Sequence, residues 1–226
     1  MLTISERDIL LFQGDSITEG GRDHAMAREP GWRHRPATLG LGYAGKIAAA
    51  LVARHPGIGV YNRGVSGDQV TDLADRWQRD CLAIKPTVLS ILVGINDTWV
   101  GAARGTPQQD NSLERFDSRY RALLDQASDA LPGVSLVLCE PFTTATGVVL
   151  ELDFYPELAE RQAIIRRIAA DYDAVWVPFQ ALFDRLCERA PPNHWAFDGV
   201  HPMAAGHHEM ARFWLQSTGV EPEPWR

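Results

Sequence analysis

The chain has 226 residues, a formal net charge of -7 and no block of like charge. A nucleic-acid-binding domain would need a basic face, which this composition does not provide, and no apolar run is long enough to span a bilayer. The first eight residues carry acidic groups and no apolar segment, so we expect no secretory signal.

The length suits one domain, and we expect residues 1–226 to form it. The cysteines are three in number, Cys81, Cys139 and Cys187, and they lie in apolar segments. Such cysteines are typical of buried free thiols in a reducing compartment. The sequence therefore predicts a cytoplasmic protein.

Apolar runs of strand length alternate along the chain with longer segments of helical period. The expected strands are Ile9–Gln13, Ile58–Asn62, Thr87–Val93, Val134–Glu140 and Val175–Val177. The expected helices are Tyr43–Arg54, Gln69–Leu82, Leu113–Ala130, Glu157–Ala170 and Met203–Gln216. This alternation predicts an α/β protein with a parallel sheet covered by helices on both faces.

Three stretches interrupt the alternation: Gly20–Gly42, Thr98–Asn111 and Pro141–Asp153. They are rich in Gly, Pro or polar residues, and we expect irregular connections there, the first with a short helix. Each lies close to the carboxyl edge of the predicted sheet. Long loops at that edge usually build a pocket.

A serine follows the first strand, in the sequence Gly14-Asp15-Ser16. This places the hydroxyl at the carboxyl end of a buried strand, where open α/β sheets bind their ligands. Ser and Asp are also common helix caps, so the serine alone leaves a purely structural role open.

Near the other end of the chain, Asp198-Gly199-Val200-His201-Pro202 puts a carboxylate three residues before an imidazole. Acyl transfer needs a histidine that takes the serine proton and a carboxylate that orients the imidazole. A histidine at the start of the last helix, with no catalytic role, is the alternative.

Two further motifs follow the second and third strands and could supply hydrogen bonds to a developing oxyanion. Gly64, in Asn62-Arg63-Gly64-Val65-Ser66-Gly67, could offer its backbone N–H, and Asn96, in Gly94-Ile95-Asn96-Asp97, could offer its side-chain amide. Each motif alone has an ordinary explanation as a turn. Four such features at one sheet edge are hard to explain by turns together.

This ordered set resembles the SGNH hydrolases, a branch of the GDSL esterases and lipases. The resemblance implies a three-layer, flavodoxin-like α/β/α fold with a central five-stranded parallel sheet. It implies Ser16 as nucleophile, His201 as general base and acid, and Asp198 as the residue that orients it. It also implies an oxyanion hole made by the backbone N–H groups of Ser16 and Gly64 and the amide of Asn96.

Within the family, the chain is most similar to intracellular acetyl-xylooligosaccharide esterases, through Leu39–Tyr43, Gly94–Trp99 and Phe197–His207. That subgroup implies removal of acetyl groups from short xylan fragments, often by a homo-oligomer. A short-chain aryl or alkyl esterase and a lysophospholipase stay open as alternatives. So do a flavodoxin-like nucleotide or flavin binder and a sugar-binding protein without activity.

Three more residues are candidates for the substrate site. Trp99 and Trp195 adjoin catalytic motifs and could pack on sugar rings, or they could only form pocket wall or a subunit contact. Asp15, beside the nucleophile, is expected to brace the turn. No metal-ligand spacing is present, so we expect neither a metal nor a cofactor.

Overall fold

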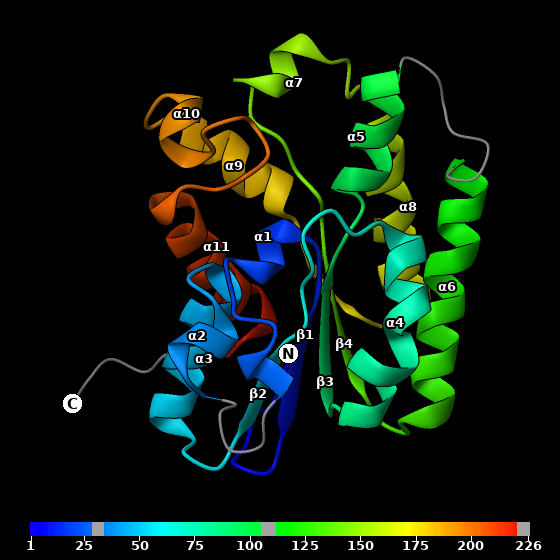
Figure 1. The fold of residues 1–226 in the computed structure, drawn as a ribbon, viewed down its shortest axis with the longest axis vertical. Helices are drawn as coiled ribbons and strands as arrows, with labels where there is room; N and C mark the ends of the chain where they lie inside the picture. The colour runs from blue at the N-terminus through cyan, green and yellow to red at the C-terminus, as the bar shows by residue number, and fades with distance from the viewer. Residues whose placement is uncertain (29–33, 105–111, 221–226) are drawn as a thin grey trace.

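The computed structural model describes residues 1–28, 34–104 and 112–220. These residues form a five-stranded parallel sheet in the order β2-β1-β3-β4-β5 (Figure 1). The strands are β1 (Ile9–Gly14), β2 (Gly59–Asn62), β3 (Val88–Leu92), β4 (Ser135–Cys139) and β5 (Val175–Val177). The predicted strands are confirmed to within one or two residues at their ends, and the predicted fold class is confirmed.

Helices cover both faces of the sheet, so the fold has three layers (Figure 1). On one face, α3 (Tyr43–Arg54) packs against α11 (Ala204–Thr218). On the other face, α4 (Val70–Asp80) packs against α6 (Leu113–Ala130), which in turn packs against α8 (Glu157–Asp171). The five long helices predicted from periodicity are therefore present, with ends shifted by no more than two residues.

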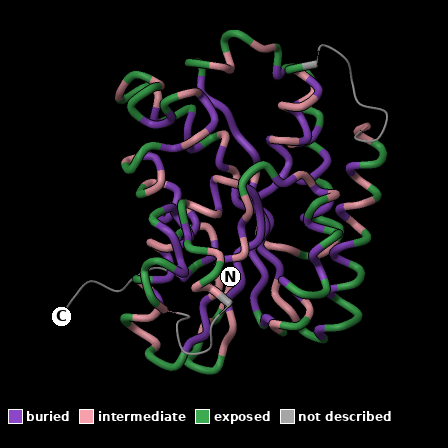
Figure 2. The backbone as a smooth tube through the Cα atoms, in the orientation of Figure 1, coloured by how far each residue is buried: buried purple, intermediate pink, exposed green. Residues whose placement is uncertain are grey.

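Alternate residues of each strand point into two separate apolar cores, because successive side chains of a strand face opposite sides. In β3, Val88 and Leu92 join the core beneath α3 and α11, whereas Leu89 and Ile91 join the core beneath α4, α6 and α8. All five residues of β3 are buried (Figure 2). A strand buried on both sides reads as an unbroken apolar run, which is why the sequence identified it.

The remaining elements are short. They are α1 (Ser16–Glu19), the 3₁₀ turns η1 (Met26–Arg28) and η2 (Leu82–Ile84), α2 (Pro36–Leu39), α5 (Ile95–Arg104), α7 (Val148–Glu151), α9 (Phe179–Cys187) and α10 (Pro192–Trp195). Helix α9 was not predicted, although it buries Phe179 and Phe183 in the core.

The prediction of an irregular connection over Thr98–Asn111 is wrong for its first part, because α5 extends to Arg104. Positions 105–111 lie outside the described residues. Polar residues and Gly101 lower the helix propensity of this stretch. Packing against α8 overrides that preference: a Cβ at Gly101 would lie 3.3 Å from the Glu157 carboxylate. The Pro141–Asp153 connection is irregular apart from α7, and the Gly20–Gly42 connection contains η1 and α2.

Strand β1 has β2 on one side and β3 on the other. The order in which successive strands are added to the sheet therefore reverses beside β1. In open α/β sheets, ligands bind at the carboxyl ends of strands at such a point. Gly14 at the end of β1 pairs with Leu92 at the end of β3. Both the Ser16 and the Asn96 motifs therefore begin at this edge.

Candidate active site

Ser16 begins helix α1 directly after β1. Asp15 caps this helix, and its side chain accepts the backbone N–H of Ile17 at 3.0 Å. The N–H of Ser16 has no acceptor among the described residues, as expected for the first residue of a helix. Both the hydroxyl and this N–H are therefore available at the carboxyl edge of the sheet.

His201 joins Ser16 to Asp198 through its two ring nitrogens. Its Nε2 lies 2.9 Å from Ser16 Oγ, and its Nδ1 lies 2.7 Å from Asp198 Oδ2. This geometry matches a neutral imidazole that accepts the serine proton at Nε2 and donates Nδ1–H to the carboxylate. The structure thus brings together three residues that come from opposite ends of the chain.

The Asp198 carboxylate is held by its own loop. Its Oδ1 accepts the backbone N–H groups of Val200 at 2.9 Å and His201 at 2.7 Å. Burial alone would raise the pKa of the Asp198 carboxyl, but these hydrogen bonds and the His201 ring outweigh it and hold the pKa below its usual range. The carboxylate therefore stays ionised and keeps orienting the imidazole.

The loop that carries Asp198 and His201 packs tightly on the connection after β4. Thr144 N–H donates to the Gly199 carbonyl at 2.8 Å. Gly199 has φ +91°, and a Cβ there would lie 2.4 Å from the Thr146 carbonyl. Only glycine fits this combination of backbone angle and close approach.

Asn96 lies in the first turn of α5, after β3. Its Nδ2 donates to the Asp68 carbonyl at 3.1 Å, and its own carbonyl accepts Gln69 Nε2 at 3.1 Å. An amide nitrogen carries two hydrogens, so one hydrogen of Nδ2 is left for another acceptor. The side chain is thus oriented by the loop after β2.

Gly64 is not placed as the sequence predicted for an oxyanion donor. It is buried, and its N–H donates to Asn62 Oδ1 at 2.9 Å. Gly67, three residues later, is exposed, with φ +84° and no atom within 4 Å of an added Cβ. In the described part of the chain the Gly67 N–H has no acceptor, and the next residue, Asp68, is the one that binds Asn96.

The three candidate substrate residues differ in exposure. Asp15 is fully buried and Trp195 is 6 % exposed, with its indole N–H on the Ala190 carbonyl at 3.2 Å. Neither side chain therefore presents a surface to a substrate in this structure. Trp99 is half-buried, with its ring centroid 5.9 Å from that of His201.

Phe197 is an exposed aromatic residue that the sequence reasoning did not select. The residue is 59 % exposed, and the centroid of its ring lies 6.0 Å from that of His201, with an angle of 20° between the ring planes. Its position directly before Asp198 was visible in the sequence, but its exposure is decided by the tertiary structure.

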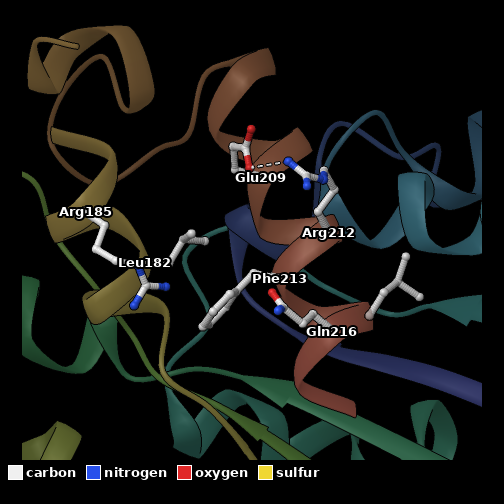
Figure 3. A pocket seen from close by; sticks show the side chains of 7 residues that line it. Leu182, Arg185, Glu209, Arg212, Phe213 and Gln216 are labelled. Carbon is white, nitrogen blue, oxygen red and sulfur yellow. Dashed lines mark hydrogen bonds and ion pairs between the residues drawn. The ribbon is translucent and has the colours of Figure 1, made fainter. Parts of the chain in front are cut away.

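A separate hollow of about 410 Å³ lies between α9 and α11 (Figure 3). Its wall carries the Glu209–Arg212 ion pair, at 3.2 Å, and Arg185, whose guanidinium lies 5.3 Å from the centre of the Phe213 ring. None of Ser16, Asp198 and His201 lines it.

The described residues include no group of three or more His, Cys, Asp or Glu that could hold a metal ion. They also include no helix with the length and apolar character that a bilayer crossing requires.

Comparison with known proteins identifies the family. The model of the GDSL-like Lipase/Acylhydrolase family matches residues 12–209. An acetylxylan esterase from Geobacillus stearothermophilus is 35 % identical over 97 % of this chain and 98 % of its own length.

Solved structures agree with that match. A protein from Parabacteroides merdae described as a GDSL-like lipase has a TM-score of 0.88 at 37 % identity, covering 97 % of this chain and 99 % of its own. Axe2, an acetylxylan esterase from G. stearothermophilus, has a TM-score of 0.84 at 31 % identity, covering 97 % and 98 %. Two variants of Axe2, with a serine or a histidine replaced by alanine, are described as catalytic mutants.

These matches span nearly the whole chain, so the alternative of a flavin or nucleotide binder without activity is wrong. The chain belongs to the GDSL-like lipase/acylhydrolase family and is a carboxylic ester hydrolase.

Proposed function

We propose that this enzyme is a serine esterase that removes acetyl groups from short xylan fragments through an acyl-enzyme on Ser16. The observation that carries the chemistry is the continuous chain from Ser16 Oγ through His201 to Asp198, with contacts of 2.9 Å and 2.7 Å. The catalytic serine and histidine variants of Axe2 support the same roles in this chain.

In the proposed reaction, Ser16 Oγ attacks the ester carbonyl carbon while His201 Nε2 takes the hydroxyl proton. His201 then gives that proton to the leaving sugar oxygen as its bond to the carbonyl carbon breaks, and the acetyl group stays on Ser16 as an ester. Water attacks the acyl-enzyme with His201 again as base, and acetate is released. Asp198 stays ionised throughout and stabilises the imidazolium.

The proposed oxyanion hole has three donors: the backbone N–H groups of Ser16 and Gly67 and one hydrogen of Asn96 Nδ2. Gly67 replaces Gly64 because the Gly64 N–H already binds Asn62. The link from Asp68 to Asn96 keeps the neighbouring Gly67 close to the amide. Donors fixed before the reaction stabilise the tetrahedral intermediate without reorganising.

The sugar is proposed to pack on Phe197 and Trp99, whose rings both adjoin His201. Aromatic rings beside a catalytic group, Phe197 exposed and Trp99 half-buried, offer apolar contact to the carbon face of a sugar ring. The acetylxylan esterases among the relatives support a sugar substrate. Trp195 is proposed as a wall residue and Asp15 as the brace of the nucleophile turn, since both are buried.

The substrate proposal is tested with acetylated xylobiose beside 4-nitrophenyl acetate, longer 4-nitrophenyl esters and a lysophospholipid. We expect acetylated xylobiose to have the highest kcat/KM. Phe197→Ala should raise KM for the sugar and leave KM for 4-nitrophenyl acetate unchanged. Phe213→Ala, in the separate hollow (Figure 3), is the control and should change neither KM. Preference for a longer acyl chain or for the lysophospholipid would contradict the substrate proposal.

The nucleophile is tested separately with a serine-directed organophosphate and mass spectrometry. The label should appear on the peptide that contains Ser16 and be absent in Ser16→Ala. That variant should lose several orders of magnitude in kcat, since triad members act as a unit. Turnover close to wild type in a clean preparation would contradict the role of Ser16.

We also propose a cytoplasmic homo-oligomer. The three cysteines are free, and burial raises the pKa of the Cys81 and Cys139 thiols to about 12, so neither is a reactive thiolate. Leu41, 79 % exposed, and Met203, 44 % exposed, are large apolar residues that a subunit contact could cover. Light scattering on the purified protein tests the oligomer, and a monomeric mass at all concentrations would exclude it.

A further inference from the structure

Arg76 is a buried charged residue on α4 that none of the roles above includes. The residue is 8 % exposed, and its guanidinium makes three hydrogen bonds and a longer ion pair, in which Nη1 lies 3.8 Å from Asp80 Oδ2. Nε donates to Asp68 Oδ2 at 2.7 Å, Nη1 donates to Gln13 Oε1 at 2.7 Å, and Nη2 donates to the Gly14 carbonyl at 3.2 Å. One side chain therefore joins the end of β1 to the loop after β2.

The hydrogen bonds from Arg76 to Gln13 and Gly14 hold the end of the strand that precedes the nucleophile. Gly14 lies two residues before Ser16, and its carbonyl accepts both Arg76 and the Val65 N–H, the latter at 3.0 Å. Gln13 is held from its other end, because its Nε2 donates to the Asp80 carbonyl at 2.7 Å. The end of β1 is thus fixed against α4.

The hydrogen bond from Arg76 to Asp68 holds the turn beside the other two proposed oxyanion donors, Gly67 and Asn96. Asp68 directly follows Gly67, and its backbone carbonyl accepts Asn96 Nδ2 at 3.1 Å. The same residue closes the turn, because its N–H donates to the Val65 carbonyl at 3.2 Å. Holding the Asp68 carboxylate therefore holds the turn that carries Gly67 and orients Asn96.

We propose that Arg76 is a positioning residue that sets the spacing between the Ser16, Gly67 and Asn96 donors of the oxyanion hole. The proposal rests on the oxyanion hole proposed above. Arg76 touches no substrate atom and acts through Gly14 and Asp68. A planar guanidinium with several fixed N–H directions can hold the end of β1 and the loop after β2 at a set distance, which a lysine ammonium cannot do.

A stabilising role alone explains this arrangement poorly. A buried ion pair is costly to desolvate, and well-packed apolar residues of similar volume are often as stable or more so. The reaction rate, by contrast, depends strongly on where the oxyanion donors lie, since a misplacement of about 1 Å can cost about 10²-fold in rate. A contact that fixes the donors therefore affects the rate more than the stability.

The test compares the steady-state kinetics of Arg76→Lys with wild type on 4-nitrophenyl acetate, a small ester that does not involve sugar binding. We expect kcat to fall about 10- to 100-fold, with KM changed by less than about threefold, because the lost interaction matters mainly in the transition state. Arg79→Lys is the matched control: it lies on the same helix, its side chain is 64 % exposed, and it pairs with Asp80. The control should keep wild-type kcat.

A double-mutant cycle with Asn96→Ala separates positioning from general damage. If Arg76 acts through the donors, Arg76→Lys should lower kcat by a clearly smaller factor once Asn96 has been removed, because only the Ser16 and Gly67 donors are then left to misplace. The same fractional loss in both backgrounds, or unchanged kcat in the single variant, would overturn the proposal.

Circular dichroism and thermal unfolding establish that each variant is folded at the assay temperature. If Arg76→Lys is not folded, Asp68→Asn breaks the charged contact from the other end and keeps the backbone carbonyl that binds Asn96. It should show the same fall in kcat and the same loss of effect in the Asn96→Ala background. Ser16→Ala separates the two proposals, because full activity of that variant would remove the oxyanion-hole chemistry itself, whatever Arg76 does.

Discussion

The backbone N–H of Gly64 donates to Asn62 Oδ1 at 2.9 Å. Asn62 is itself 1 % exposed, and its Nδ2 donates to the carbonyls of Thr18 at 2.7 Å and Leu39 at 2.8 Å. This one side chain therefore ties α1, α2 and the loop after β2 together. The Gly64 N–H is used in this set of hydrogen bonds. Of the two glycines in this loop, Gly67 is the one with open space around it.

Gly64→Ala and Gly67→Ala should consequently fail in different ways. A Cβ at Gly64 would lie 2.4 Å from Glu19 N and 2.9 Å from the Asp15 carbonyl, so this variant should lose about 1–3 kcal/mol or more of stability. Gly67→Ala meets no neighbour but has φ +84°, so the turn must shift and move its N–H.

We expect Gly67→Ala to lower kcat by at least about tenfold with a smaller loss of stability than Gly64→Ala. Urea denaturation and steady-state kinetics on the same preparations check this. Wild-type kcat in Gly67→Ala would mean that a group other than the Gly67 N–H donates this hydrogen bond to the oxyanion.

Asn96→Ala should lower kcat by about 10²–10³-fold, the usual cost of one oxyanion donor. The Asp68 carbonyl loses its contact with Nδ2 in this variant, but the fold should persist, because Asp68 keeps its ion pair with Arg76 at 2.7 Å. Steady-state kinetics check the split between kcat and KM. A rise in KM alone would mean that Asn96 binds substrate and transition state equally.

Asp198→Asn should lower kcat by several orders of magnitude without unfolding the protein, with about 10⁴-fold as a guide from serine hydrolase chemistry. An amide at this position can offer an N–H to Nδ1, which favours the wrong imidazole tautomer. Asp198→Glu is a useful companion, because it keeps the charge and changes the reach. Full activity of the amide variant would show that another group orients His201.

Asp15 should make stability depend on pH. Burial, with smaller contributions from Asp97 and Asp68, raises the pKa of the Asp15 carboxyl to about 7 despite the Ile17 hydrogen bond. Between the unfolded value of about 4 and this value, the native state binds more protons than the unfolded chain, so this group lowers stability as pH rises.

Asp15→Asn keeps the acceptor for Ile17 and removes the titration. Compared with wild type, its free energy of unfolding should improve from about pH 4 to about pH 7, by no more than ~4 kcal/mol. Urea denaturation of both proteins across this range checks the sign. A difference that is constant with pH would mean that Asp15 does not titrate there.

The helices and strands were largely predictable because their signals are local. Continuous apolar runs such as Val88–Leu92 predict strands buried on both sides, and the period of Glu157–Asp171 predicts a helix with one buried face. Helix α5 was missed over Thr98–Arg104, because its stability comes from packing on α8 and not from its own propensity.

The sequence by itself predicted the α/β architecture and the family, and both are confirmed. It also named Ser16, Asn96, Asp198 and His201 as candidate site residues, since each of these follows a strand or lies in a recognisable turn motif. The tertiary structure alone decided that the Gly64 N–H binds Asn62 while the Gly67 N–H does not, and that Trp195 is buried while Phe197 is exposed. It also decided that Arg76 joins the end of β1 to the loop after β2. Those outcomes depend on contacts between residues far apart in the chain, such as Arg76 and Gly14. A local sequence pattern does not specify which distant residue a polar group or an aromatic ring contacts.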